Sequence, residues 1–189
     1  MISIYFVRHA LPDYSFDDDA TMPLTSEGKR DSLKVLDKLN DVHFDFCLSS
    51  PYKRTVETIL PLVKQLNLDL HTDPRLKERA RGKINNNYQE LLKKRWDNFD
   101  FSEENGESMN SLQQRNIAVL FEILSKHKNE NILFSTHGAA LSSILNYFNP
   151  NFGYLDFVRI QNFTPYILKI DFNEQNKIIG QKELLIISK

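Results

Sequence analysis

The first strand of this chain constrains its fold more than any other stretch. Residues 2–7 read Ile-Ser-Ile-Tyr-Phe-Val, so both faces of a strand there are mostly apolar. Such a strand is typical of the interior of a sheet that has helices on both sides. Arg8 and His9 follow at once, and a buried strand has no room for an arginine. They therefore mark the point where the chain leaves the sheet, and ligands bind at this carboxyl end in open α/β sheets.

The rest of the chain repeats the same pattern of a strand followed by a helical apolar stripe. Further strands are predicted at residues 44–49, 68–71, 131–136, 157–161, 166–172 and 177–187, with a turn at 164–165. The pattern predicts one α/β domain over residues 1–189, with three layers (α/β/α) and a mixed, mostly parallel sheet. Residues 82–106 are rich in asparagine and charge, with a helix predicted at 88–96, and we interpret them as an insertion or a lid.

Charged groups follow several of these strands. Arg54 comes after the second strand, in the first turn of a helix that Ser50 and Pro51 are predicted to start. Glu78 follows the third strand and His137 the fourth. Right-handed crossovers place the carboxyl ends of parallel strands on one side of the sheet, so these groups are expected to converge with those after the first strand.

Composition excludes several classes of protein. The 24 basic and 25 acidic residues nearly cancel, which argues against nucleic acid or a membrane surface as a partner. No apolar run is long enough to span a membrane, and no secretory signal is found, so we expect the cytoplasm. Cys47 is the only cysteine, which rules out an intrachain disulfide and a thiolate cage for a metal. The run Asp17-Asp18-Asp19 is interpreted as part of a solvated loop.

Phosphoryl transfer through a histidine fits the converging set. A neutral imidazole at His9 can attack phosphorus, while Arg8 and Arg54 bind the non-bridging oxygens. His137 can donate a further hydrogen bond to them. Glu78 can protonate the leaving alkoxide and then accept a proton from water. No metal ligand pattern appears, and no metal or other cofactor is expected, because the arginines take over the role of a cation.

The motifs also resemble, in order, those of the histidine phosphatase superfamily, which includes the cofactor-dependent phosphoglycerate mutases. The similar segments are Arg8-His9-Ala10, Leu24-Thr25-Ser26-Glu27-Gly28, residues 49–55, Leu76-Lys77-Glu78-Arg79, Gly106-Glu107-Ser108 and Thr136-His137-Gly138. The resemblance implies a phosphoglycerate mutase-like fold, a phosphohistidine on His9 and Glu78 as proton donor. Gly138 after His137 excludes the branch that uses a His-Asp acid.

The sequence departs from the family pattern in three places. Ala10 replaces the glycine after the nucleophile, residues 82–85 lack the aromatic-Glu-Gly signature, and the arginine frequent after His137-Gly138 is missing. These departures indicate a divergent small phosphatase subgroup that acts on a small phosphorylated metabolite.

Three functions remain open from the sequence. The first is hydrolysis of phosphate monoesters by a histidine acid phosphatase-like enzyme, and the second is a mutase that returns the phosphoryl group to another hydroxyl. The third is an inactive protein that binds a phosphorylated ligand. Rival carboxylates for the role of acid are Glu103, Glu104 and Glu107. Further residues that could line a substrate pocket, without a specific role assigned, are Tyr14, Arg79, Arg81 and Trp96.

Overall fold

A single six-stranded sheet organises the computed structural model, which describes residues 1–83 and 87–189. Its strand order is β3-β2-β4-β1-β5-β6. The pairs among β3, β2, β4 and β1 are parallel, whereas β5 pairs antiparallel with both β1 and β6. The strands are β1 (Ile2–Arg8), β2 (Phe46–Ser49), β3 (Leu70–Thr72), β4 (Asn131–Thr136), β5 (Phe163–Phe172) and β6 (Ile178–Ser188). The predicted three-layer fold with a mixed sheet is confirmed.

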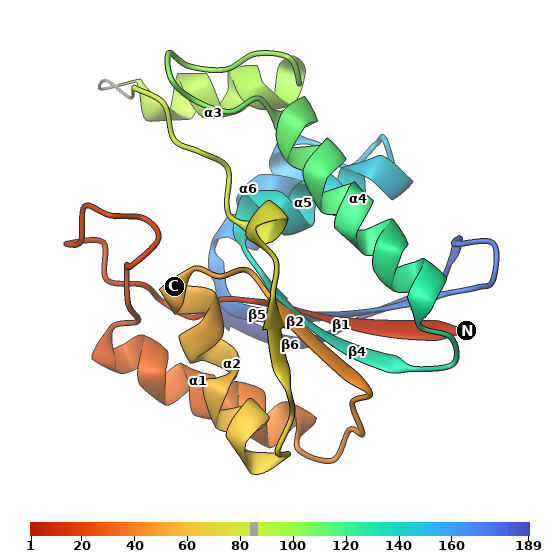
Figure 1. Ribbon diagram of the computed structural model, residues 1–189. Helices are drawn as coiled ribbons and strands as arrows, with labels where there is room; N and C mark the ends of the chain where they lie inside the picture. The colour runs from red at the N-terminus through yellow and green to blue at the C-terminus, as the bar shows by residue number, and fades with distance from the viewer. Residues whose placement is uncertain (84–86) are drawn as a thin grey trace.

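Helices cover both faces of this sheet (Figure 1). α1 and α2 lie on one face, and α4, α5 and α6 lie on the other, with α3 above the carboxyl ends of the strands. The helices are α1 (Ser26–Leu39), α2 (Lys53–Gln65), α3 (Tyr88–Asp97), α4 (Met109–Lys126), α5 (Gly138–Phe148) and α6 (Tyr154–Gln161). Among the described residues, no helix has the length and apolarity needed to cross a bilayer.

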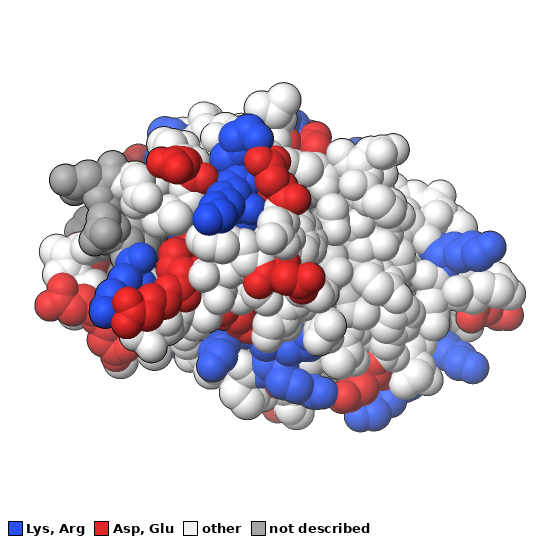
Figure 2. Space-filling view, turned by 90° about the horizontal axis from the view of Figure 1, so that it is seen from above, with Lys and Arg blue, Asp and Glu red and all other residues white. Residues whose placement is uncertain are grey.

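The central strand β1 feeds both cores because its side chains alternate between the faces. Ile4 and Phe6 belong to the cluster beneath α4 and α5, whereas Tyr5 and Val7 belong to the cluster beneath α1 and α2. Residues 2–7 of β1 are buried as predicted, but the expectation that Arg8 leaves the strand is wrong, because Arg8 is the last residue of β1 and is buried as well. On the face of the molecule seen in Figure 2, acidic and basic side chains lie interspersed, in keeping with the net charge of −1.

The strand predicted at residues 157–161 is wrong, because this segment belongs to α6. Its run Phe-Val-Arg-Ile-Gln suits either structure, but Gly153 caps a helix and its N–H donates to the Asp156 carboxylate at 2.9 Å. Phe157 and Ile160, three residues apart, are the buried positions, as on a helix face. The turn predicted at 164–165 is wrong as well, since both residues lie inside β5.

α2 begins at Lys53, three residues after the predicted cap at Ser50. Its N-cap residue is Tyr52, which makes no side-chain cap, while the Ser50 hydroxyl contacts His137 and accepts the Tyr52 N–H at 3.3 Å. The predicted insertion at 82–106 carries α3 as predicted, although residues 84–86 lie outside the described part of the chain.

Candidate active site

The strand ends converge on one pocket of about 410 Å³. Arg8 and His9 at the end of β1, Arg54 in α2 and Glu78 after β3 all line it. His137 lies directly behind, fully buried, with its ring centroid 5.3 Å from that of His9. The structure therefore brings together all five residues that the sequence singled out.

His9 is held as a neutral imidazole with one free nitrogen. Its Nδ1 donates to the Ala10 carbonyl at 2.8 Å, so the lone pair lies on Nε2. Burial, followed by the charges of Arg54 and Arg8, lowers the pKa of His9 well below its usual 6.5. The ring is thus kept in the form that can act as a nucleophile.

Ala10 fits at the position where the histidine phosphatase motif has glycine. Its N–H donates to the Thr58 hydroxyl at 2.8 Å, and its backbone is not in the left-handed region that favours glycine. Glycine is needed instead at position 138. A Cβ added to Gly138 would lie 3.0 Å from the Nε of Arg8, so a side chain there would press on the guanidinium.

Arg8 points its guanidinium along the end of β1. Its Nη1 donates to the carbonyls of Ile160 at 2.5 Å and Phe163 at 2.7 Å, while its buried Nε has no hydrogen-bond partner. The side chain is fixed from one side by α6 and β5 and keeps an unused donor. A guanidinium held in this way is suited to binding an anion.

Arg54 is held by the loop that was predicted to be solvated. Its Nη1 donates to the Asp19 carbonyl at 2.5 Å and lies 3.2 Å from the Asp19 carboxylate. The same carboxylate lies 3.6 Å from Arg81. Only 2 % of Arg54 is exposed, so Asp19 is the counter-ion of a buried cation, and the interpretation of this aspartate as merely solvated is wrong.

His137 is positioned by Ser50. The Nε2 of His137 lies 2.8 Å from the Ser50 hydroxyl, and its buried Nδ1 has no partner. Burial, followed by the charges of Arg54 and of the neighbouring His9, lowers the pKa of His137 well below 6.5. Sequence reasoning assigned Ser50 to a helix cap and so missed this contact.

Glu78 is anchored at the start of α5. Its carboxylate accepts the N–H groups of Ala139 at 3.1 Å and Ala140 at 3.2 Å, as well as that of Arg79 at 2.9 Å. The arrangement places the carboxylate on a helix N-terminus, where backbone donors attract negative charge. The Arg79 side chain pairs with Glu103 and not with the neighbouring Glu78.

The three rival carboxylates are occupied elsewhere, and none of them lines the pocket. Glu103 pairs with Arg79 and Arg95, and Glu104 pairs with Lys83 at 2.8 Å. Glu107 pairs with Arg115 at 2.7 Å. Burial raises the pKa of both Glu103 and Glu107, but their arginine partners outweigh it and the net shift is downward. Because these carboxylates lie outside the pocket and are paired with cations, none of them is placed to protonate a leaving group there.

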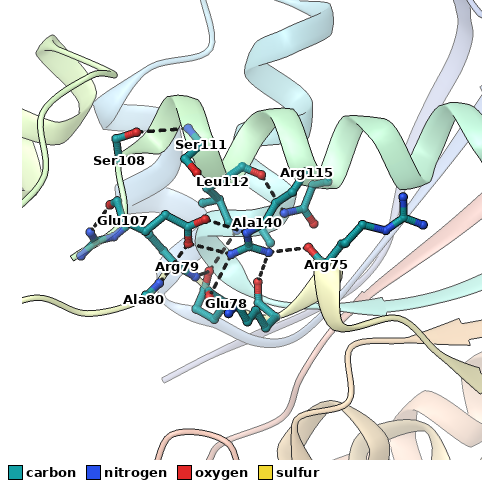
Figure 3. A network of polar contacts seen from close by, with 12 residues as sticks. Arg75, Glu78, Arg79, Ala80, Glu107, Ser108, Ser111, Leu112, Arg115 and Ala140 are labelled. Atoms are coloured by element: carbon teal, nitrogen blue, oxygen red, sulfur yellow. Dashed lines mark hydrogen bonds and ion pairs between the residues drawn. The ribbon is translucent and has the colours of Figure 1, made fainter. Parts of the chain in front are cut away.

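Hydrogen bonds from Arg115 hold the segment that contains Glu78 against α4 (Figure 3). Arg115 grips both Glu107 oxygens, at 2.7 and 2.8 Å, and it also donates to the carbonyls of Arg75, Lys77 and Glu78. The residue lies on α4, so one side chain joins that helix to the whole segment from the end of β3 to Glu78. Nothing in the sequence marked Arg115 for this role.

The outer part of the pocket is formed by α3, α6 and two loops. Tyr14, Arg79, Arg81 and Trp96 all line it, as the sequence suggested they could. Arg79 and Trp96 are buried, with 5 % and 9 % exposed, whereas Tyr14 is 64 % exposed. Residues that sequence reasoning missed here are Tyr88, Leu92, Arg95, Met109, Phe157 and Gln161. The spacing of positions 88, 92 and 95, on the same predicted helix as Trp96, was the signal that could have found three of these residues.

Within the described residues there is no cluster of three or more histidine, cysteine or carboxylate side chains that could hold a metal. Cys47 lies in β2, and burial raises the pKa of its thiol to about 12. A thiol held protonated in this way is not a nucleophile.

The fold and the pocket define an α/β protein with a histidine between two arginines at the strand ends. The chain belongs to the histidine phosphatase superfamily (branch 1), since a sequence model of that family matches residues 4–181. Enzymes of this kind hydrolyse or transfer phosphoryl groups, so this chain is a phosphatase or a mutase-type enzyme.

Similar proteins carry both activities in their names. The chain is 27% identical over 159 residues to a probable phosphoglycerate mutase GpmB of Proteus mirabilis, covering 77% of this chain and 74% of that one. It is 25% identical over 149 residues to an uncharacterized phosphatase PhoE of Bacillus subtilis, covering 77% and 76%. A phosphoserine phosphatase variant from Entamoeba histolytica, solved in complex with phosphoserine, shares the fold with a TM-score of 0.77 and 17% identity, over 96% of each chain.

Proposed function

We propose that this protein hydrolyses phosphate monoesters of a small metabolite through a phosphohistidine on His9. The observation that carries the proposal is the state of His9. Its Nδ1 is occupied by the Ala10 carbonyl, which leaves Nε2 unprotonated in a pocket lined by Arg8, Arg54 and Glu78. A nucleophile, two cations and a carboxyl group in one pocket are the parts that metal-free phosphoryl transfer needs.

In the first step, Nε2 of His9 attacks phosphorus and the ester P–O bond breaks. Arg8 and Arg54 bind the non-bridging oxygens and stabilise the charge that develops on them. Glu78 gives its proton to the leaving alkoxide. The Asp19 carboxylate, which pairs with Arg54, must move away from the guanidinium when the phosphoryl oxygens bind there.

In the second step, Glu78 accepts a proton from a water molecule, and the water oxygen attacks phosphorus. The P–N bond breaks, Nε2 of His9 regains its lone pair, and inorganic phosphate is released. His137 serves as a further donor, because a protonated Nε2 can share its hydrogen between Ser50 and a phosphoryl oxygen.

The mutase is the second candidate, and the similarity to a probable phosphoglycerate mutase supports it. Hydrolysis is favoured because the family resemblance implies that mutases carry longer insertions than this chain, to cage a bisphosphorylated intermediate. We propose that α3, the helix of the insertion at 82–106, forms one wall of the substrate pocket. Cytoplasmic location stays a prediction.

A panel of phosphomonoesters, assayed with and without 2,3-bisphosphoglycerate, separates the candidates. We expect release of inorganic phosphate without that cofactor. Phosphoryl migration that depends on it would instead show a mutase, and no turnover of any ester would show a binding protein.

Vanadate tests the role of the arginines. It adopts the five-coordinate geometry of the transition state, so it should inhibit more strongly than phosphate. Arg54→Ala should weaken vanadate far more than a neutral competitor. Equal losses for both would mean that Arg54 shapes the pocket without binding the phosphoryl group.

A further inference from the structure

The pocket extends well beyond the proposed phosphoryl site. Its volume of about 410 Å³ lies in the range of sites for whole small molecules. The additional space is bordered mainly by α3 and α6, and the group that occupies it must belong to the alcohol part of the substrate. The chemistry of that alcohol can therefore be read from the residues that border the space.

One side of this space is apolar. Leu92 and Trp96 project from the same face of α3, and Phe157 faces them from α6. The ring centroids of Trp96 and Phe157 are 5.4 Å apart. These side chains form one buried cluster with Met109, so they make a firm surface next to the phosphoryl site. An apolar or aromatic body would pack on that surface.

The other side carries two buried arginines that share one carboxylate. Arg79 Nη1 donates to Glu103 at 3.0 Å, and Arg95 Nε donates to the other oxygen of the same group. The Arg95 Nη2 also forms an ion pair with Glu103, so both guanidinium groups rely on this one carboxylate. Two guanidinium groups against one carboxylate leave one positive charge uncompensated. Burial, followed by the charge of Arg95, lowers the pKa of Arg79, as two crowded cations should.

The surplus charge lies on the leaving-group side of the reaction. Arg79 follows Glu78 directly in the chain, and Glu78 as the proposed acid must face the oxygen of the leaving alcohol. An anion bound by Arg79 and Arg95 is therefore a substituent of that alcohol and is distinct from the phosphoryl group. Two buried arginines that share one carboxylate carry a net positive charge, which attracts such an anion.

Building on the proposed function, we propose that the substrate is a phosphomonoester whose alcohol has an apolar body and one anionic group. The body packs on Leu92, Trp96 and Phe157, and the anion, a carboxylate, binds between Arg79 and Arg95. The alternative is that the two arginines only hold Glu103 in place. That role would affect stability without distinguishing one alcohol from another.

Binding of phosphonates tests the subsite without requiring turnover. Calorimetry should compare benzylphosphonate with its 3- and 4-carboxy derivatives. The better carboxy derivative should bind about tenfold more tightly to the wild type, as expected for a charge-assisted pair. Equal dissociation constants for all three compounds would overturn the proposal.

The preference for the carboxy derivative over benzylphosphonate should depend on the total charge of Arg79, Arg95 and Glu103. The measured quantity is the dissociation constant of benzylphosphonate divided by that of the better carboxy derivative. Arg95→Gln removes the surplus positive charge, so this ratio should fall to about one. Glu103→Gln adds a positive charge, so the ratio should rise. Lys93→Gln is the matched control, since Lys93 lies on the same helix but is exposed and pairs with Asp97. Its ratio should stay at the wild-type value.

Each outcome is decisive. If Arg95→Gln does not fold, the Glu103→Gln variant still decides. A ratio that stays constant in whichever of these two variants folds would show that the arginines are only structural. If the carboxylate preference behaves as expected but no phosphate ester is hydrolysed, the subsite stands and the proposed hydrolysis fails. If benzyl phosphate is hydrolysed without any carboxylate preference, the hydrolysis stands and the subsite fails.

Discussion

Glu78 is the residue whose role can be separated most sharply from mere binding. A general acid accelerates phosphorylation most when the leaving group cannot depart without a proton. Glu78→Gln keeps the size of the side chain, so it should slow phosphorylation by alkyl phosphates about 10²–10⁴-fold. Phosphorylation by p-nitrophenyl phosphate should suffer far less, because p-nitrophenolate leaves without help.

Pre-steady-state kinetics must separate the two steps, since steady-state rates can hide the difference. Dephosphorylation should slow for both esters, so phosphoenzyme should accumulate after a burst. If phosphorylation slows equally for both leaving groups, or for neither, Glu78 is not the acid.

Asp19 competes with phosphate for Arg54. Its carboxylate lies 3.2 Å from Arg54 Nη1, so Asp19→Asn should leave the guanidinium freer to bind an anion. We expect the inhibition constant of inorganic phosphate to fall by up to about fivefold, the scale of a partly exposed ion pair. Asp17→Asn makes the same charge change at an exposed site in this loop and is the control. Weaker phosphate binding in Asp19→Asn would show that Asp19 orients Arg54 rather than competing with its ligand.

At the scale of elements, α4 and the segment from the end of β3 to Glu78 act as one unit through Arg115. Arg115→Lys keeps the charge but loses the fork that bonds Glu107 and three carbonyls. A shift of the Glu78 carboxyl should lower kcat/KM on alkyl phosphates about ten- to a hundredfold more than on p-nitrophenyl phosphate.

Arg159→Lys is the control for this substitution, because the Arg159 side chain bonds both oxygens of Glu183 on β6 and makes no contact with the segment that carries Glu78. It should show no such difference between the two leaving groups. An equal loss for both esters in Arg115→Lys would mean that Arg115 supports the fold alone.

The sequence predicted those elements whose signals are local. β1 and β4 each have an apolar centre, and both strands and the histidines that follow them were predicted correctly. α6 was missed because five residues with mixed polarity do not distinguish a period of 2 from one of 3.6. The roles of Ser50, Arg95 and Arg115 were missed for another reason. Each depends on a partner more than five residues away, which only the folded chain brings near.

At the scale of the whole molecule, two buried neutral histidines make the protein sensitive to acid. The pKa values of His9 and His137 are lowered by burial and by nearby arginines, whereas the unfolded chain titrates near 6.5. Below that pH the unfolded chain binds more protons than the folded one, so acid favours unfolding. These groups should leave stability unchanged well above pH 6.5.

The free energy of unfolding should then fall by up to about 1.4 kcal/mol per pH unit for each histidine as the pH drops below 6.5. Urea titrations from pH 8 to pH 5 measure this slope. The double variant His9→Asn/His137→Asn should show a flatter profile. A profile with the same slope in wild type and variant would contradict the assignment of neutral, buried histidines.

The central claim is that His9 carries the phosphoryl group, and one measurement tests it directly. The enzyme is mixed with p-nitrophenyl phosphate labelled in its phosphoryl group and quenched in alkaline denaturant during the burst. The wild type should hold a label that is stable in alkali and lost in acid, as expected for phosphohistidine, and Glu78→Gln should hold more of it. The His9→Ala variant, shown to be folded by its circular dichroism spectrum, should hold no label and should not turn over the ester. A folded His9→Ala enzyme that keeps the label, or that turns over near the wild-type rate, would contradict the mechanism.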